Sequence, residues 1–196
     1  MKPKHENFDA GKVSERKDDF CGYRFCPLCG NPLVLKHLDG LPRKICDSPE
    51  CGFIYYQNPV PAAAAIIVEN DRVLLVKRAH PPKINWWCLP AGFMEWSEHP
   101  SDTAVRELEE ETGLKVRLTG FFEVYTGKDD PRVNAVLLLY LADVIGGRLQ
   151  ASDDALEVKF FGFDEIPDKI AFESHRRALD DYSRRFRSSP NSSPSS

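Results

Sequence analysis

The chain lacks long apolar runs. None approaches the roughly 20 residues that a membrane-spanning helix needs, and the longest, Ala135–Ala142, is expected to form a buried strand. The first residues, Met1–Val13, are charged and lack the apolar segment of a secretory signal. We therefore expect a cytoplasmic protein with no membrane partner.

The chain also lacks an excess of positive charge. Its 26 lysines and arginines are outnumbered by 30 acids, which gives a formal net charge of −4. Nucleic-acid-binding domains normally carry a basic footprint, so this balance argues against a nucleic-acid partner. The 196 residues are 42% hydrophobic and 29% charged. These values are typical of a globular domain, alone or with a small module, and exclude wholesale disorder.

Composition divides the chain into four segments. Residues 1–20 contain few large apolar side chains and are predicted to be disordered. Residues 21–57 hold five of the six cysteines and are predicted to form a small unit of their own. Residues 58–186 are predicted to form an α/β core, and the serine- and proline-rich residues 187–196 a disordered tail.

Within the core, hairpin-like strand pairs dominate over a regular alternation of strands and helices. This favours a mixed sheet flanked by helices over a parallel doubly wound sheet. Apolar spacing and terminal residues predict two helices, Pro100–Thr112 and Phe172–Phe186. Extended segments are predicted at Ala62–Val68, Arg72–Lys77, Trp87–Pro90, Val116–Tyr125, Val133–Val144 and Glu157–Phe161.

The segment Glu95–Glu111 is strongly acidic, with seven acids and one arginine. On a helix, Glu107, Glu110 and Glu111 share one face, where like charges destabilise the bare helix. A hard cation such as Mg²⁺ or Mn²⁺ would offset this repulsion, because carboxylate oxygens are its preferred ligands. Gly92, just upstream, lets the backbone approach a ligand closely. The alternative is an acidic face in contact with solvent alone.

The spacing of this segment resembles the Nudix box, G-x5-E-x7-R-E-U-x-E-E-x-G-U, in which U is aliphatic. Gly92 and Glu98 supply the first two fixed positions, and the run from Arg106 to Leu114 supplies the others without a gap. The resemblance implies an α/β/α sandwich with a mixed sheet. It also implies a hydrolase that cleaves a nucleoside diphosphate linked to another group.

The same resemblance implies roles for individual residues. Divalent Mg²⁺ or Mn²⁺ would be bound by Glu107, Glu110 and Glu111, with the backbone of Gly92. Arg106 and Glu98 would form a supporting pair that orients these carboxylates. An ordinary helix ion pair with Glu110, four residues away, is the alternative interpretation of Arg106.

Four cysteines form two short pairs. Cys26 and Cys29 are followed, after sixteen residues, by Cys46 and Cys51. Two such pairs around a hairpin-sized segment suit a tetrahedral Zn²⁺ site, and disulfides are not expected in a chain without an export signal. The alternative is a set of reduced, buried cysteines. Cys88 is expected to be a buried strand residue.

The segment Phe25–Ala65 resembles the zinc ribbon that precedes the core in NADH-pyrophosphatase-like Nudix proteins. By analogy, this small zinc ribbon is also expected to support a homodimer. The array Ser-Gln-Pro-Trp-Pro-Phe-Pro-x-Ser, which those pyrophosphatases carry after the Nudix box, is absent from Gly120–Asn134. The shorter zinc-ribbon relatives, which include flavin-dinucleotide and ADP-ribose pyrophosphatases, are therefore more similar.

The resemblance predicts a nucleotide-derived substrate of the ADP-ribose, FAD or NADH class, cleaved to AMP and a second phosphate ester. Glu111 would polarise the attacking water, and Glu157 is the candidate general base, with a solvent-facing strand residue as the alternative. Stacking surfaces for a base are sought among Trp86, Phe93, Trp96 and Tyr125. Two rival functions stay open: a ligand sensor or nucleic-acid-binding protein, and a hydrolase of damaged nucleoside triphosphates.

Overall fold

The computed structural model describes residues 23–130, 133–152 and 154–187. The chain divides into two compact units between Asn58 and Pro59, and each is described here by itself. The predicted disordered segment 1–20, Cys21 and residues 188–196 of the predicted tail lie outside the described residues.

The first unit is a small antiparallel sheet of three strands in the order β1-β2-β3. The strands are β1 (Leu33–Leu38), β2 (Leu41–Cys46) and β3 (Ile54–Tyr55). Between β1 and β2, Asp39 and Gly40 both have positive φ, at 52° and 75°. A two-residue turn of this kind matches the twist of the paired strands and sets their register.

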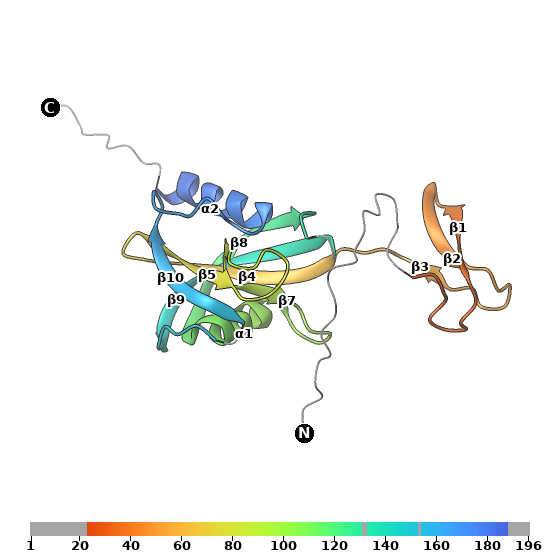
Figure 1. Cartoon of the computed structure of the whole chain (residues 1–196), viewed down its shortest axis with the longest axis horizontal. Helices are drawn as coiled ribbons and strands as arrows, with labels where there is room; N and C mark the ends of the chain where they lie inside the picture. The colour runs from red at the N-terminus through yellow and green to blue at the C-terminus, as the bar shows by residue number, and fades with distance from the viewer. Residues whose placement is uncertain (1–22, 131–132, 153, 188–196) are drawn as a thin grey trace, which may run out of the picture. The chain divides into compact units, whose positions relative to one another are not determined.

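The second unit contains a mixed sheet of seven strands (Figure 1). Its main path runs β10-β5-β4-β9-β8, while β6 pairs with β5 and β7 with β4. Only β4 and β9 run parallel among these pairs within the described residues. The strands are β4 (Val60–Glu69), β5 (Arg72–Arg78), β6 (Trp87–Cys88), β7 (Ala91–Phe93), β8 (Leu114–Gly127), β9 (Ala135–Gly147) and β10 (Ala155–Gly162).

Helices α1 (Pro100–Thr112) and α2 (Glu173–Phe186) cover opposite faces of this sheet (Figure 1). The alternation of side chains along β4 explains the two layers. Ala64 and Ile66 pack in the core that contains Leu179 of α2. The intervening residue Ala65 packs in the core that contains Leu108 of α1. The predicted α/β/α sandwich with a mixed sheet is confirmed.

Helix α1 has well-defined ends. The His99 side chain accepts a hydrogen bond from the backbone of Ser101, Pro100 occupies the first turn, and Gly113 ends the helix with a φ of 69°. Its buried face carries Thr103, Ala104, Leu108 and Thr112. Because this face is anchored in the core, the glutamates of the Nudix-like segment lie on the remaining surface of the helix.

The predicted elements are all present in the core, and the first helix has the predicted bounds. Most strands are longer than predicted, above all β8, which begins at Leu114 and ends at Gly127. In contrast, β6 is shorter than the predicted Trp87–Pro90, β9 begins two residues after the predicted Val133, and β7 was not predicted. Several register shifts between β8 and β9 accommodate this length. Neither of the helices found in the described part of the chain has the length and apolar character that a bilayer span requires.

Candidate functional site

A cavity of about 470 Å³ opens at one end of the sheet in the second unit. Its volume lies in the range that suits a small-molecule ligand. Both helices and several strands contribute to its wall. The lining residues used below are Arg78, His80, Cys88, Ala91, Gly92, Phe93, Glu107, Glu110, Glu111, Asp129, Asp154, Phe172, Ser174 and His175.

The segment between β6 and β7 connects the two helices at this cavity. The backbone N–H of Leu89 donates to Nδ1 of His175 on α2, at 3.1 Å. Two residues later, the N–H of Ala91 donates to Oε2 of Glu111 on α1, also at 3.1 Å. Leu89 itself is fully buried. A rigid extended segment therefore fixes one side chain from each helix.

Arg106 forms the centre of an ion-pair network on α1. Its guanidinium contacts both oxygens of Glu98, at 2.5 and 2.9 Å. It also lies 2.7 Å from Glu107 and 3.0 Å from Glu110. Glu98 is held in turn by the hydroxyl of Thr103, at 2.7 Å. Bidentate, charge-assisted hydrogen bonds of this kind fix the positions of the carboxylates around Arg106.

The Glu107 carboxyl group lies directly against Gly92. A Cβ atom added at position 92 would lie 2.0 Å from Cδ of Glu107. No side chain fits in that space without displacing the carboxylate. The absence of a side chain at Gly92 thus permits a close approach between β7 and α1. The contact of the Gly92 backbone with a ligand stays a prediction.

Glu107, Glu110 and Glu111 all line the cavity. Their oxygens are not brought as close together as the cysteine sulfurs described below, because Arg106 binds two of them and Ala91 the third. The donor set is nevertheless the one that a hard divalent cation takes: several carboxylates beside a backbone segment, in a partly enclosed site. The residues present fit Mg²⁺ or Mn²⁺.

The site perturbs the pKa values of its acids in opposite directions. Burial raises the pKa of Glu111 to about 8, and the nearby charge of Glu107 acts in the same direction. Burial also raises the pKa of Glu107, against the effect of Arg106. Hydrogen bonding from Arg106 lowers the pKa of Glu98 to about 2. A carboxyl that burial keeps protonated gains most from a bound cation.

Glu157 is not among the residues that line this cavity. Its carboxylate is exposed and lies 3.5 Å from Nζ of Lys77 on the neighbouring strand. The acid from this part of the chain that does line the cavity is Asp154, which lies 3.2 Å from Nε2 of His80. A bulge lies between Ala155 and Glu157 at the start of β10, directly after Asp154.

The aromatic residues considered as stacking surfaces differ in their exposure and in whether they line the cavity. Tyr125 is buried, and its hydroxyl donates to Asp181 at 2.8 Å, so it belongs to the core. Phe93 lines the cavity and is 41% exposed. Trp96 is fully exposed but does not line the cavity. Phe93 is therefore the aromatic residue of this group that can meet a ligand in the cavity.

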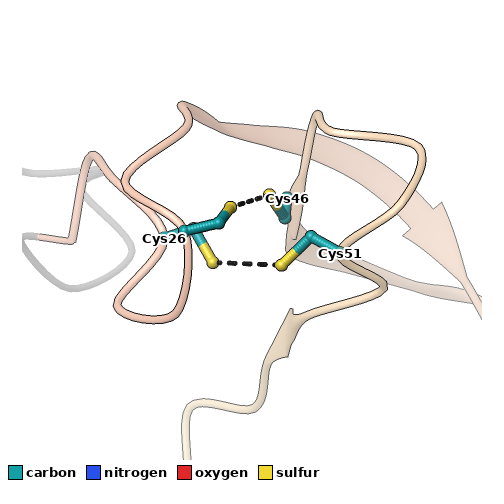
Figure 2. A group of neighbouring side chains, drawn as sticks. Cys26, Cys46 and Cys51 are labelled. Atoms are coloured by element: carbon teal, nitrogen blue, oxygen red, sulfur yellow. Dashed lines mark hydrogen bonds between the residues drawn. The ribbon is translucent and has the colours of Figure 1, made fainter.

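The four predicted zinc ligands form a compact cluster in the first unit. Their sulfur atoms all lie within 4.8 Å of one another, a closeness that no other set of three or more His, Cys, Asp or Glu side chains reaches in the described residues. The cluster consists of two facing sulfur pairs, Cys26 with Cys51 at 3.6 Å and Cys29 with Cys46 at 3.4 Å (Figure 2). Four thiols in this arrangement fit a tetrahedral Zn²⁺ ion.

Backbone hydrogen bonds support this cluster. The N–H of Gly30 donates to the carbonyl of Cys26, and the N–H of Cys46 to the carbonyl of Phe53. The side chain of Asn31 donates to Sγ of Cys29 and, with its backbone, lowers the pKa of that thiol to about 6. The thiolate form, which binds metal, is thereby favoured at Cys29. Cys88 is buried in the second unit, as expected.

Several cavity residues were not found by sequence reasoning. Asp154, Arg78 and the adjacent pair Ser174 and His175 come from three separate places along the chain. Ser174 and His175 belong to the predicted closing helix Phe172–Phe186, in which His175 shares the three- and four-residue spacing of the apolar side chains. Their exposure is low, 6% and 4%, yet both line the cavity.

Two protein families match the chain. The family described as NUDIX domain matches residues 58–182, and the family described as Nudix N-terminal matches residues 24–57. Together they cover both units of the structure.

The chain is also similar to individual relatives and to a solved structure. The chain is 39% identical over 130 residues to an ADP-ribose pyrophosphatase of Methanocaldococcus jannaschii, a match that covers 66% of this chain and 76% of the relative. It is 28% identical to a NAD-capped RNA hydrolase NudC of Chromobacterium violaceum over 81% of this chain, which spans only 57% of that relative. A NUDIX hydrolase structure from Nitrosomonas europaea superposes with a TM-score of 0.73 at 36% identity, covering 86% of this chain and 95% of that chain.

Proposed function

Because the chain belongs to the Nudix hydrolase family, we propose that it cleaves the diphosphate bond of a nucleoside diphosphate linked to another group. The substrate belongs to the ADP-ribose, FAD or NADH class, and the products are AMP and a second phosphate ester. The observation that carries this proposal is Glu111, a half-buried acid on the cavity wall whose Oε2 is held by the N–H of Ala91.

The relatives support ADP-ribose as the first substrate to test. The relative named ADP-ribose pyrophosphatase is 39% identical, and this chain spans 76% of its length. The relative named NAD-capped RNA hydrolase is 28% identical, and the chain spans 57% of it. The missing Ser-Gln-Pro-Trp-Pro-Phe-Pro-x-Ser array points in the same direction, away from NADH.

We place Mg²⁺ or Mn²⁺ at Glu107, Glu110 and Glu111, beside the backbone of Gly92. When bound, such ions supply an activated water and offset the charge that develops on the leaving phosphate. The structural Zn²⁺ belongs to Cys26, Cys29, Cys46 and Cys51, in the other unit. The two kinds of site differ in donor atoms, oxygen against sulfur, and therefore in the metal each selects.

The protein groups have separate tasks in this mechanism. Arg106 holds the carboxylates of Glu107 and Glu110 while Glu98 fixes the guanidinium. The N–H of Ala91 holds Oε2 of Glu111, which leaves Oε1 to interact with the water or its metal. Electrostatic groups that are already in place when charge develops lower the barrier without further reorganisation.

A second acid is needed if the attacking water is to lose its proton to the protein. Asp154 is better placed than Glu157 for this task, because it lines the cavity while Glu157 contacts Lys77. We therefore assign the general base to Asp154 and retain Glu157 as the comparison variant.

The test is incubation of the purified protein with Mg²⁺ and ADP-ribose, FAD or NADH, followed by mass spectrometry of the products. The proposal expects AMP and a second phosphate ester from at least one of them, and loss of turnover in Glu111→Gln. Binding without any phosphate-containing product would instead favour a ligand sensor. Pyrophosphate release from nucleoside triphosphates, with dinucleotides intact, would favour a hydrolase of damaged nucleotides.

A further inference from the structure

The first turn of α2 carries two buried polar groups that the proposed chemistry does not use. Ser174 and His175 are 6% and 4% exposed, and both line the cavity. Nδ1 of His175 accepts the hydrogen bond from Leu89. The described residues provide no hydrogen-bond partner for Nε2 of His175 or for the hydroxyl of Ser174. Two donors on largely buried residues thus line the cavity without a described protein acceptor.

The protonation state of His175 follows from its surroundings. Since the N–H of Leu89 points at Nδ1, that nitrogen carries a lone pair, and the proton of the neutral ring is on Nε2. Burial lowers the pKa of His175 to about 4, and the charge of Arg78 acts in the same direction. The ring is therefore uncharged near neutral pH and offers one N–H donor to the cavity.

The cations nearby are already engaged. Lys83 donates to Asp129, at 3.1 Å, and to the carbonyl of Ala171. Arg78 donates to the carbonyls of His80, Pro81 and Pro82. The charge of Lys83 is thus paired with Asp129, whereas the three carbonyls hold the Arg78 guanidinium in place without neutralising it.

An acidic group completes this part of the wall. Asp129 lines the cavity, and its Oδ2 accepts hydrogen bonds from Lys83 and from the N–H of Glu173. A carboxylate next to two neutral donors can accept hydrogen bonds from hydroxyl groups. The ligand chemistry that matches is a group rich in hydroxyls, which both donates and accepts.

The same region offers no free ring for a base. Phe172 lines the cavity, but Arg78 and Lys83 lie 5.0 and 5.8 Å from its ring centre, and the His175 ring lies 5.2 Å away. The aromatic face that is accessible to a ligand is that of Phe93, next to Gly92 and the glutamates. The nucleoside is thus better accommodated near Phe93, and a sugar without a base near α2.

We propose that Ser174 and His175 form a subsite for the hydroxyl groups of a sugar carried on the second phosphate of the substrate. This inference rests on the proposed function and specifies it further. Among the candidate substrates it selects a nucleoside diphosphate joined directly to a sugar, as in ADP-ribose. Ser174 and His175 are specificity residues, since neither contacts the glutamates through any hydrogen bond described above.

The test compares two substrates that share the adenosine and the diphosphate. ADP-ribose carries the second sugar, whereas the methyl ester of ADP carries a methyl group in its place. Loss of one uncharged hydrogen bond should lower kcat/KM for ADP-ribose by about tenfold in Ser174→Ala and in His175→Asn. The kcat/KM for the methyl ester should stay unchanged. Asparagine retains an acceptor for the N–H of Leu89 and removes the donor at Nε2.

Asp180→Asn, an exposed change on the same helix, serves as the matched control and should alter neither substrate. Because the ratio of the two kcat/KM values is measured within one protein sample, partial misfolding of a variant does not affect it. An unchanged ratio in both variants overturns the subsite. A wild-type protein that cleaves neither ester with Mg²⁺ or Mn²⁺ overturns the proposed function, and the subsite with it.

Discussion

The carboxylate of Glu111 and the backbone N–H of Ala91 are joined by a hydrogen bond of 3.1 Å at the wall of the cavity. This contact ties the last turn of α1 to β7, the strand that also carries Gly92. Burial raises the Glu111 pKa to about 8, so the carboxyl is mostly protonated near neutral pH unless a cation stabilises its anion. The Glu111 carboxyl group is therefore held in one position, and a bound cation would favour its charged form.

The first prediction concerns Glu111 itself. Glu111→Gln retains an oxygen that can accept from Ala91 but removes the negative charge. Turnover of ADP-ribose should fall by about 10³-fold or more, as expected when a group that acts on the reacting water is lost. The thermal midpoint near neutral pH should not fall, because the amide is uncharged, like the protonated carboxyl that it replaces. Turnover within tenfold of wild type would contradict the assigned role.

Gly92→Ala tests the close approach of β7 to α1. The added Cβ would lie 2.0 Å from the Glu107 carboxyl carbon, so the carboxylate has to move. Steady-state kinetics should show at least a 100-fold loss of kcat/KM, since misplacement by about 1 Å has effects of this size. Gly120→Ala is the matched control, because nothing lies within 4 Å of a Cβ at that position. Equal activity in the two variants would argue against the packing role of Gly92.

The third prediction is a pH dependence of activity. Because the Glu111 pKa is raised to about 8, the carboxyl is largely protonated at pH 6 to 7 and must lose its proton before it binds a cation. At low, fixed Mg²⁺, kcat/KM should therefore rise with pH up to about 8. Higher Mg²⁺ should move the midpoint to lower pH. A pH profile that is flat between 6 and 8 at low Mg²⁺ would be inconsistent with this carboxyl as a ligand.

The fourth prediction concerns the pH dependence of stability. It follows from Glu98, whose pKa is lowered rather than raised. Its folded pKa, about 2, lies below the ordinary value of 4.5 because Arg106 donates to the carboxylate. The stabilisation is therefore complete above pH 4.5 and is lost as the pH falls towards 2. Denaturant unfolding of wild type and Glu98→Gln should show a difference at pH 6 that shrinks over this window. A difference that stays constant with pH would mean that the Glu98 charge contributes nothing.

The cysteine cluster gives a prediction about metal content. Elemental analysis should find one zinc per chain in wild type and a loss of that zinc in Cys46→Ser. Cys88→Ser should retain it, because Cys88 lies in the other unit. Since four deprotonated thiols must be held together by the metal, chelation should unfold residues 23–58, as seen by limited proteolysis. Full protection after zinc removal would show that the unit is stable by itself.

Most residues of the candidate site could be predicted because they are regularly spaced within short stretches of the sequence. The glutamates of α1 share one helical face because they are three and four residues apart, and the two cysteine pairs are each held by a short turn. Gly92 and Glu98 were identified by the same linear pattern. In these cases a few neighbouring residues determine the geometry, and one sequence contains the necessary information.

The residues that were missed depend on contacts distant in sequence. His175 is held at the cavity by a hydrogen bond from the backbone N–H of Leu89, which is 86 residues away in the sequence. Glu157 follows a bulge at the start of β10, and shifting a strand by one residue reverses the faces of its side chains, while Asp154 lies just before this strand. Neither the bulge nor the pairing of β10 with β5 leaves a signal in the local pattern, so the acid next to the cavity could not be chosen from sequence.

The most direct test of the whole account is a crystal of the protein soaked with Mn²⁺ and the methylene analogue of ADP-ribose, whose central bond resists hydrolysis. The account predicts anomalous density for manganese between the diphosphate analogue and the carboxylates of Glu107, Glu110 and Glu111. Nucleotide bound in the cavity with no manganese at these three side chains would contradict it.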